Sequence, residues 1–103
     1  MNNSHRWVGG ARIGFWNATW PFAQLSVTKE QLLLKVGILG TYTFKPDDVT
    51  SVEPYGWLPF LGKGVRINHR LSQYPEKIVF WYLCANPKPI AETIHQMGFG
   101  SVH

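Results

Sequence analysis

The sequence WPFAQLSVTKEQLLLKV, residues 20–36, decides the fold because it has the pattern of a β-hairpin. Its apolar residues recur at a period of two, which is typical of strands with one buried face. These residues are Ala23, Leu25 and Val27 in the first half and Leu32, Leu34 and Val36 in the second. Lys29 and Glu30 form a charged turn between the halves. The stretch therefore predicts two antiparallel strands whose apolar faces point into one core.

More segments with strand character surround the hairpin. They are residues 41–45, 49–55, 64–70 and 77–83, with a short edge strand at Ile13, Phe15 and Trp16. β-branched and aromatic residues favour strands, and the intervening Gly, Pro and Asp residues favour turns. Residues 77–83 are apolar on both faces, which predicts a central strand covered on both sides. Short strands joined without helices predict an antiparallel barrel or sandwich.

The periodicity changes after Asn86-Pro87-Lys88-Pro89, which predicts the start of a helix. One apolar stripe follows, formed by Ile90, Ala91, Ile94 and Met97. Gly98 is suited to the left-handed position after a helix, and Phe99 is placed to fold back onto the last turn. His95 is assigned to the solvated face. This amphipathic helix has the shape to plug an open end of the barrel.

Length and composition predict one domain. The chain has 103 residues, of which 45% are hydrophobic and 16% charged, so it has enough apolar material for a core. Residues 1–10 are polar and contain Gly9-Gly10, which predicts a flexible N-terminal leader ahead of a domain spanning residues 11–103. The net charge of +4 favours an anionic partner. The sequence lacks, however, the dense stripe of Lys and Arg that is typical of a nucleic-acid binder.

The single cysteine, Cys84, excludes an intrachain disulfide. It lies in the longest apolar run, residues 78–85, and is predicted to be a buried side chain. That run is far shorter than the ~20 residues of a membrane-spanning helix, and the first residues lack the apolar region of a signal peptide. We expect a soluble, cytoplasmic protein.

Particular residues carry a family resemblance. They are TWPFAQLSV (19–27), Leu32, Leu34, YTFKPDDV (42–49), GVRINH (64–69), IVF (78–80) and Gly98-Phe99. In this order they resemble the bacterial branch of the pleckstrin-homology-like (PH-like) superfamily. The resemblance implies an antiparallel barrel of six or seven strands in two near-orthogonal sheets, capped by a C-terminal helix. It also implies a scaffold that binds protein, peptide or lipid, without enzymatic chemistry.

A loop of unusually apolar content supplies the first candidate site. Its large apolar residues are Tyr55, Trp57, Leu58, Phe60 and Leu61, framed by Pro and Gly. Closure of the barrel core is one explanation for them. The other is an exposed patch, which marks an interface. On the second reading, the protein acts by contact with a protein partner or by self-association as an oligomer.

A cationic group supplies the second candidate site, formed by Lys63, Arg66 and Arg70. Arg66 and Arg70 fall on one strand face at a period of two. The group is either a solvated outer face or a site for an anionic ligand, such as the head groups of an acidic membrane surface, aided by the aromatic segment Trp7–Trp16. The eukaryotic lipid-binding members of the superfamily carry a basic pattern across the first hairpin, where this chain has only Lys29 and Lys35.

Catalytic and metal-binding patterns are missing from the sequence. The four histidines lack ligand spacing, and only one cysteine could join them. Asp47 and Asp48 are adjacent, so they point apart and suit a turn better than an acid–base pair. The serines lack the Gly-flanked elbow of a nucleophile. We therefore expect no enzymatic activity, no cofactor, no metal and no nucleic-acid partner.

Overall fold

Seven antiparallel strands and one C-terminal helix form the fold in a computed structural model, which describes residues 4–55, 63–82 and 88–100. The strands are β1 (His5–Ile13), β2 (Trp16–Val27), β3 (Leu32–Val36), β4 (Gly40–Phe44), β5 (Val49–Tyr55), β6 (Lys63–His69) and β7 (Ile78–Tyr82). Two short 3-10 turns, η1 (Gly37–Leu39) and η2 (Pro46–Asp48), flank β4, and the helix is α1 (Lys88–Gln96). The strand order is β4-β3-β2-β1-β7-β6-β5.

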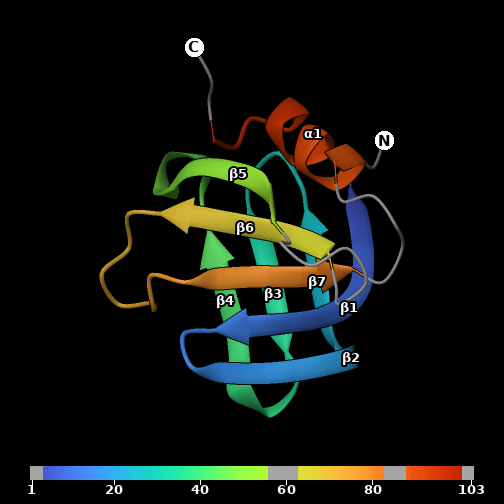
Figure 1. Ribbon diagram of the computed structural model, residues 1–103. Helices are drawn as coiled ribbons and strands as arrows, with labels where there is room; N and C mark the ends of the chain where they lie inside the picture. The colour runs from blue at the N-terminus through green and yellow to red at the C-terminus, as the bar shows by residue number, and fades with distance from the viewer. Residues whose placement is uncertain (1–3, 56–62, 83–87, 101–103) are drawn as a thin grey trace.

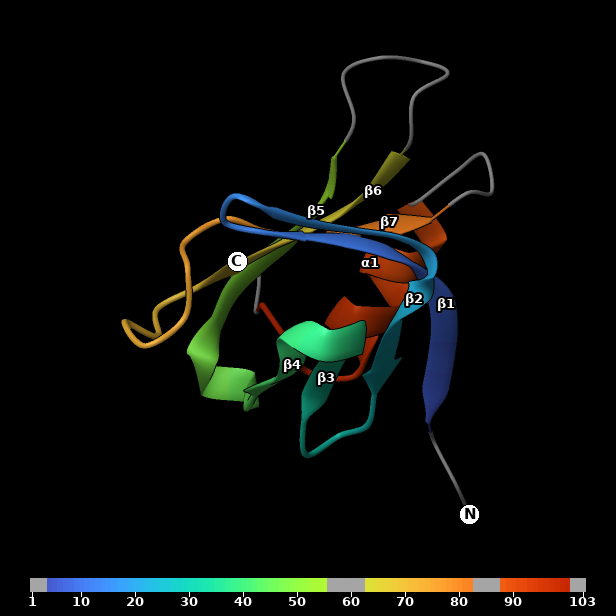
Figure 2. The same ribbon diagram turned by 90° about the horizontal axis from the view of Figure 1, so that it is seen from below.

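β1 and β2 each serve both halves of this sheet, which curls into a half-open barrel (Figures 1 and 2). Residues 23–27 of β2 lie between β1 and β3, whereas residues 16–18 pair with the far end of β1, beside β7. The register changes from Gly9 opposite Ala23 to Ala11 opposite Ala18. β2 therefore carries extra residues between the two parts, here called the β2 bulge (residues 19–22), and the sheet bends there. The predicted fold class, an antiparallel barrel of six or seven strands capped by one C-terminal helix, is confirmed.

The bend explains the glycine pair in β1. A Cβ atom on Gly9 would overlap the carbonyl oxygen of Trp81, and one on Gly10 would lie 2.5 Å from that of Ala18. Close approach of the backbones therefore requires glycine at both positions. The predicted flexible leader over residues 1–10 is wrong for residues 5–10, which belong to β1. The glycine pair marks a bend within a strand and not a break before one.

A turn replaces the edge strand predicted at Ile13, Phe15 and Trp16. Ile13 ends β1, Trp16 begins β2, and the two residues lie opposite each other across a two-residue turn. Gly14 has a φ of 61°, as the first central position of a type II′ turn requires. The chain thus reverses where a continuous strand was expected.

The core lies between the two halves of the sheet. The six alternating apolar residues of the 20–36 hairpin are all fully buried, which confirms the predicted inward faces. Phe44, Ile67 and Phe80 extend the same core from β4, β6 and β7. Val79 on the opposite face of β7 is also fully buried, so this strand is covered on both sides as predicted.

α1 closes one end of the barrel, near β5 and β6 (Figure 1). Its buried residues are Ile90, Ala91 and Ile94. The Phe99 amide donates to the Ile94 carbonyl at 3.3 Å, and the Gly98 amide donates to that of His95 at 2.9 Å. With Gly98 at a φ of 104°, these bonds complete the predicted helix-terminating motif. Phe99 is fully buried, so the motif fastens the end of the helix to the core.

His95 does not lie on the solvated helix face to which it was assigned. It is half-buried, and its Nε2 donates a hydrogen bond to the carbonyl oxygen of Val52 in β5 at 3.0 Å. β5 ends the strand order, so α1 satisfies a polar group that the sheet leaves unpaired. In the described part of the chain, no helix has the length and apolar character needed to cross a membrane. Cys84 lies outside the described residues.

Candidate functional site

Large apolar side chains are exposed in two neighbouring segments. The exposed residues are Phe15, Trp16, Trp20 and Phe22, from the β1–β2 turn to the β2 bulge, and Ile38 in η1. Phe15 is 97% exposed and Ile38 is fully exposed. In Figure 1 the β1–β2 turn and η1 lie at the end of the barrel away from α1. Large apolar side chains left exposed in neighbouring segments are typical of an interaction site.

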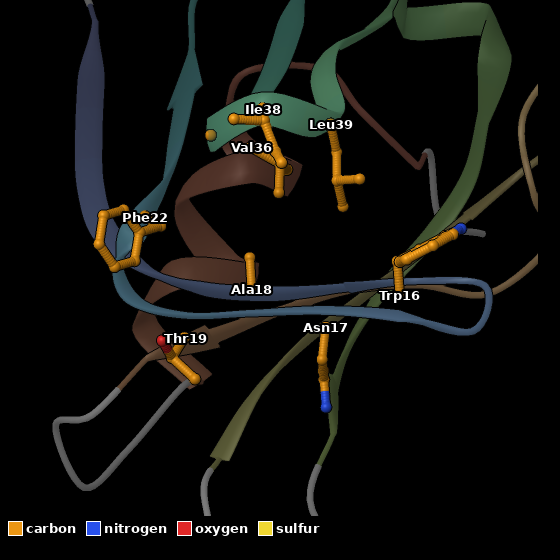
Figure 3. A pocket seen from close by; sticks show the side chains of 9 residues that line it. Trp16, Asn17, Ala18, Thr19, Phe22, Val36, Ile38 and Leu39 are labelled. Carbon is orange, nitrogen blue, oxygen red and sulfur yellow. The ribbon is translucent and has the colours of Figure 1, made fainter.

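A groove of about 390 Å³ lies between these segments. One wall is residues 16–19 of β2 together with Phe22, and the other is residues 36–39 of β3 and η1. In Figure 3 Ala18 points from β2 toward the wall that carries Val36 and Leu39, whereas Asn17 points to the opposite side of β2. The lining contains no charged residue. We call this feature the end groove.

The end groove exists because β2 lacks a second partner along its first part. β3 pairs with β2 only from Ala23 onward, so residues 16–19 form an edge of the sheet. Trp16 lies opposite Ile13, and residues opposite each other across a ladder point to the same face. Ile13 is 1% exposed, but Trp16 is 66% exposed. Trp16 therefore sits on the core face at a place where no described residue covers it.

The predicted apolar loop is described only at its first residue. Trp57, Leu58, Phe60 and Leu61 lie outside the described residues. Tyr55 is half-buried, with its ring 5.7 Å from that of Trp81 and with the Nζ of Lys77 over it at 5.6 Å. Both contacts lie on the outer face of the sheet, where Tyr55 packs against its neighbours.

Two of the three side chains in the predicted cationic group, those of Arg66 and Arg70, are described. Arg66 is half-buried in β6 and lies between Val79 of β7 and Glu53 of β5. Its Nε is buried without a hydrogen-bond partner among the described residues. Arg70 is exposed just past the end of β6, and its amide donates to the Asp48 carbonyl. The side chain of Lys63 lies outside the description. The acidic side chain beside Arg66 weakens attraction to an anion at this surface.

His69 holds the β6–β7 loop in place. The Leu71 amide donates to its Nδ1 at 3.0 Å, so Nε2 carries the proton and donates to the Pro75 carbonyl at 2.8 Å. The Phe44 and Tyr74 rings flank the imidazole. The hydroxyl of Tyr74 accepts a bond from the Thr43 amide on the outer edge of β4 at 3.1 Å. Both ring nitrogens of His69 are therefore used in structural bonds.

In the described ranges, no three or more His, Cys, Asp or Glu residues come together as a potential metal site. Comparison of the chain with protein-family models gives no match, and comparison with curated protein sequences gives none either. The geometry of the end groove is therefore the strongest observation that bears on function.

Proposed function

We propose that this protein is a non-catalytic PH-like interaction module that makes protein–protein contact through the end groove. The observation that carries the proposal is Trp16, a tryptophan on the core face of the sheet that is 66% exposed. Leaving such a ring in water forgoes about 1.5–3 kcal/mol of hydrophobic free energy. A protein surface seated on the groove recovers that free energy, and Trp and Phe are enriched in protein interfaces.

The lining of the groove favours a protein over an anionic ligand. Its residues are apolar or neutral, and Phe22 and Ile38 form an apolar margin. An anion gains nothing from such a surface, because it has to give up its hydration without a cation to replace it. Binding of acidic lipid head groups by Lys63, Arg66 and Arg70 remains the alternative function, and it uses a different face of the molecule.

Two of the described histidines, His69 and His95, support the non-catalytic part of the proposal. A general base needs a nitrogen that can reach substrate. His69 uses both nitrogens within the fold, and His95 uses Nε2 to hold α1 to β5. Neither imidazole lines the end groove.

Site-specific photo-crosslinking in cells tests the proposal. A photoreactive phenylalanine analogue replaces Ile38, whose side chain is fully exposed at the groove. The matched control carries the same analogue in place of Val8, an exposed aliphatic residue of β1 that does not line the groove. We expect a discrete protein adduct from position 38 and none from position 8.

Two results would contradict the proposal. Equal adducts from both positions would indicate random collision, and the absence of a protein adduct at 38 would remove the contact. Enrichment of the crosslinker in lipid instead would favour the membrane alternative. The experiment does not depend on whether the contacting protein is a second copy of the chain.

A further inference from the structure

The edge of β2 beside the end groove presents unpaired backbone groups. Ile13 and Trp16 close a two-residue turn, so they form a hydrogen-bonded pair of the ladder. Hydrogen-bonded and non-bonded pairs alternate in an antiparallel ladder, so the next pair, Arg12 with Asn17, is non-bonded on this side. The N–H and C=O of Asn17 therefore point away from β1. No other described strand pairs with them.

Such an edge specifies the kind of occupant. Unpaired N–H and C=O groups in a row are satisfied by another extended strand, which lies about 4.8 Å away. A strand at that distance from β2 runs along the opening of the end groove, and every second side chain enters the groove. The edge and the groove thus have one occupant in common, a β-strand with apolar residues on one face.

The chain itself contains a strand of this description. Residues 16–19 alternate between the groove side, with Trp16 and Ala18, and the outer side, with Asn17 and Thr19. The same surface presents a projecting side chain, Ile38, next to a hollow. A two-fold dimer needs both on one patch, because the same patch occurs on each side of the interface.

We infer that a second copy of this chain binds antiparallel along the β2 edge, with Asn17 of one copy opposite Asn17 of the other. In this register the two residues exchange a pair of backbone hydrogen bonds. Trp16 of each copy then lies opposite Ala18 of the other on the groove side. The small alanine leaves room for the indole ring over the partner's groove. The inference rests on the proposed function and names the partner.

Molecular mass as a function of protein concentration tests the inference. Sedimentation equilibrium of the full chain is expected to approach twice 11.8 kDa at high concentration. Asn17→Pro removes the edge N–H but no bond to β1, and proline is tolerated at sheet edges. Since it removes two of the new bonds, it is expected to weaken self-association at least about tenfold. Asn17→Thr, which keeps the N–H, is the matched control.

Amide hydrogen exchange gives a second measurement, which needs no variant. The Asn17 amide is expected to exchange quickly in dilute solution and to become protected as the concentration rises. A second matched pair is Ile38→Lys, expected to give the single-chain mass, and Val8→Lys, expected to behave as the unaltered chain.

The outcomes separate the inference from the function on which it rests. A single-chain mass at all concentrations overturns the dimer but not contact with another protein. In another outcome, Ile38→Lys abolishes the double mass, whereas the Asn17→Pro variant still dimerises and the Asn17 amide of the unaltered chain stays unprotected. This result overturns strand pairing and keeps the end groove as the interface. A double mass that resists both substitutions overturns the inference, and with no crosslink at position 38 it overturns the proposed function as well.

Discussion

His95 of α1 and Val52 of β5 are joined by a hydrogen bond from Nε2 to the backbone carbonyl oxygen, 3.0 Å long. The bond connects the helix to an edge strand and crosses 43 residues of sequence. It therefore fixes the plug at one end of the barrel, while the other end holds the end groove. The two ends differ in how they respond to substitution.

His95→Ala is expected to lower the free energy of unfolding by about 1–2 kcal/mol, because it leaves the Val52 carbonyl without its partner. Urea unfolding followed by circular dichroism measures the change. Gln96→Ala is the control, since Gln96 is exposed in the same helix turn. Equal losses in the two variants would show that the bond does not stabilise the helix contact.

Gly9→Ala is expected to destabilise the fold by about 1–3 kcal/mol, because the new methyl group meets the Trp81 carbonyl oxygen. Thermal unfolding measures this cost. The neighbouring Val8→Thr alters an exposed, β-branched side chain and is expected to stay within about 0.5 kcal/mol. A Gly9→Ala protein as stable as Val8→Thr would mean that β1 does not approach β7 as described.

Ile38→Ser is expected to leave the free energy of unfolding within about 0.5 kcal/mol of the unaltered chain, because the side chain is fully exposed. Phe44→Ala, in the core, is expected to cost about 3–5 kcal/mol. Urea unfolding at low protein concentration compares the two. A large loss of unfolding free energy in Ile38→Ser would show that the Ile38 side chain stabilises the fold and is not a surface available for contact.

Sedimentation with lipid vesicles is expected to be equally weak whether or not the vesicles contain acidic lipid. The reason is that Arg66 lies beside Glu53 and the end groove carries no charge. The combined Lys63→Gln, Arg66→Gln and Arg70→Gln variant is the matched protein. Binding that requires acidic lipid, weakens with salt and disappears in that variant would establish the anionic-surface alternative.

Periodicity in the sequence predicts the parts of the fold that are set locally. Leu25 and Leu34 lie on the predicted face and opposite each other, and Gly98 ends the helix as expected. The local sequence places Gly9 in a leader, because a glycine pair usually interrupts a strand. Its actual role depends on the approach of Trp81, which is 72 residues away in sequence and leaves no local pattern.

The end groove was missed for a similar reason. Trp20 and Phe22 occupy positions that alternate with the inward-facing residues beginning at Ala23. The alternation alone therefore predicts that both side chains are exposed, as they are. Trp16, by contrast, is on the inward face. Its exposure depends on where β3 stops pairing with β2, and pairing between strands is a property of the whole sheet.

The β2 bulge gives the end groove the geometry of a wedge. Its two walls are residues 16–19 and 36–39, and they converge where Ala23 pairs with Val36, beyond the bulge. β2 runs without interruption from the first wall to the Ala23–Val36 pair where the walls meet. The angle between the walls is therefore set by the bend within β2 and not by the packing of separate elements. To separate the two walls, β2 would have to straighten at the bulge. The end groove therefore favours a thin occupant, such as a single strand, over a bulky one.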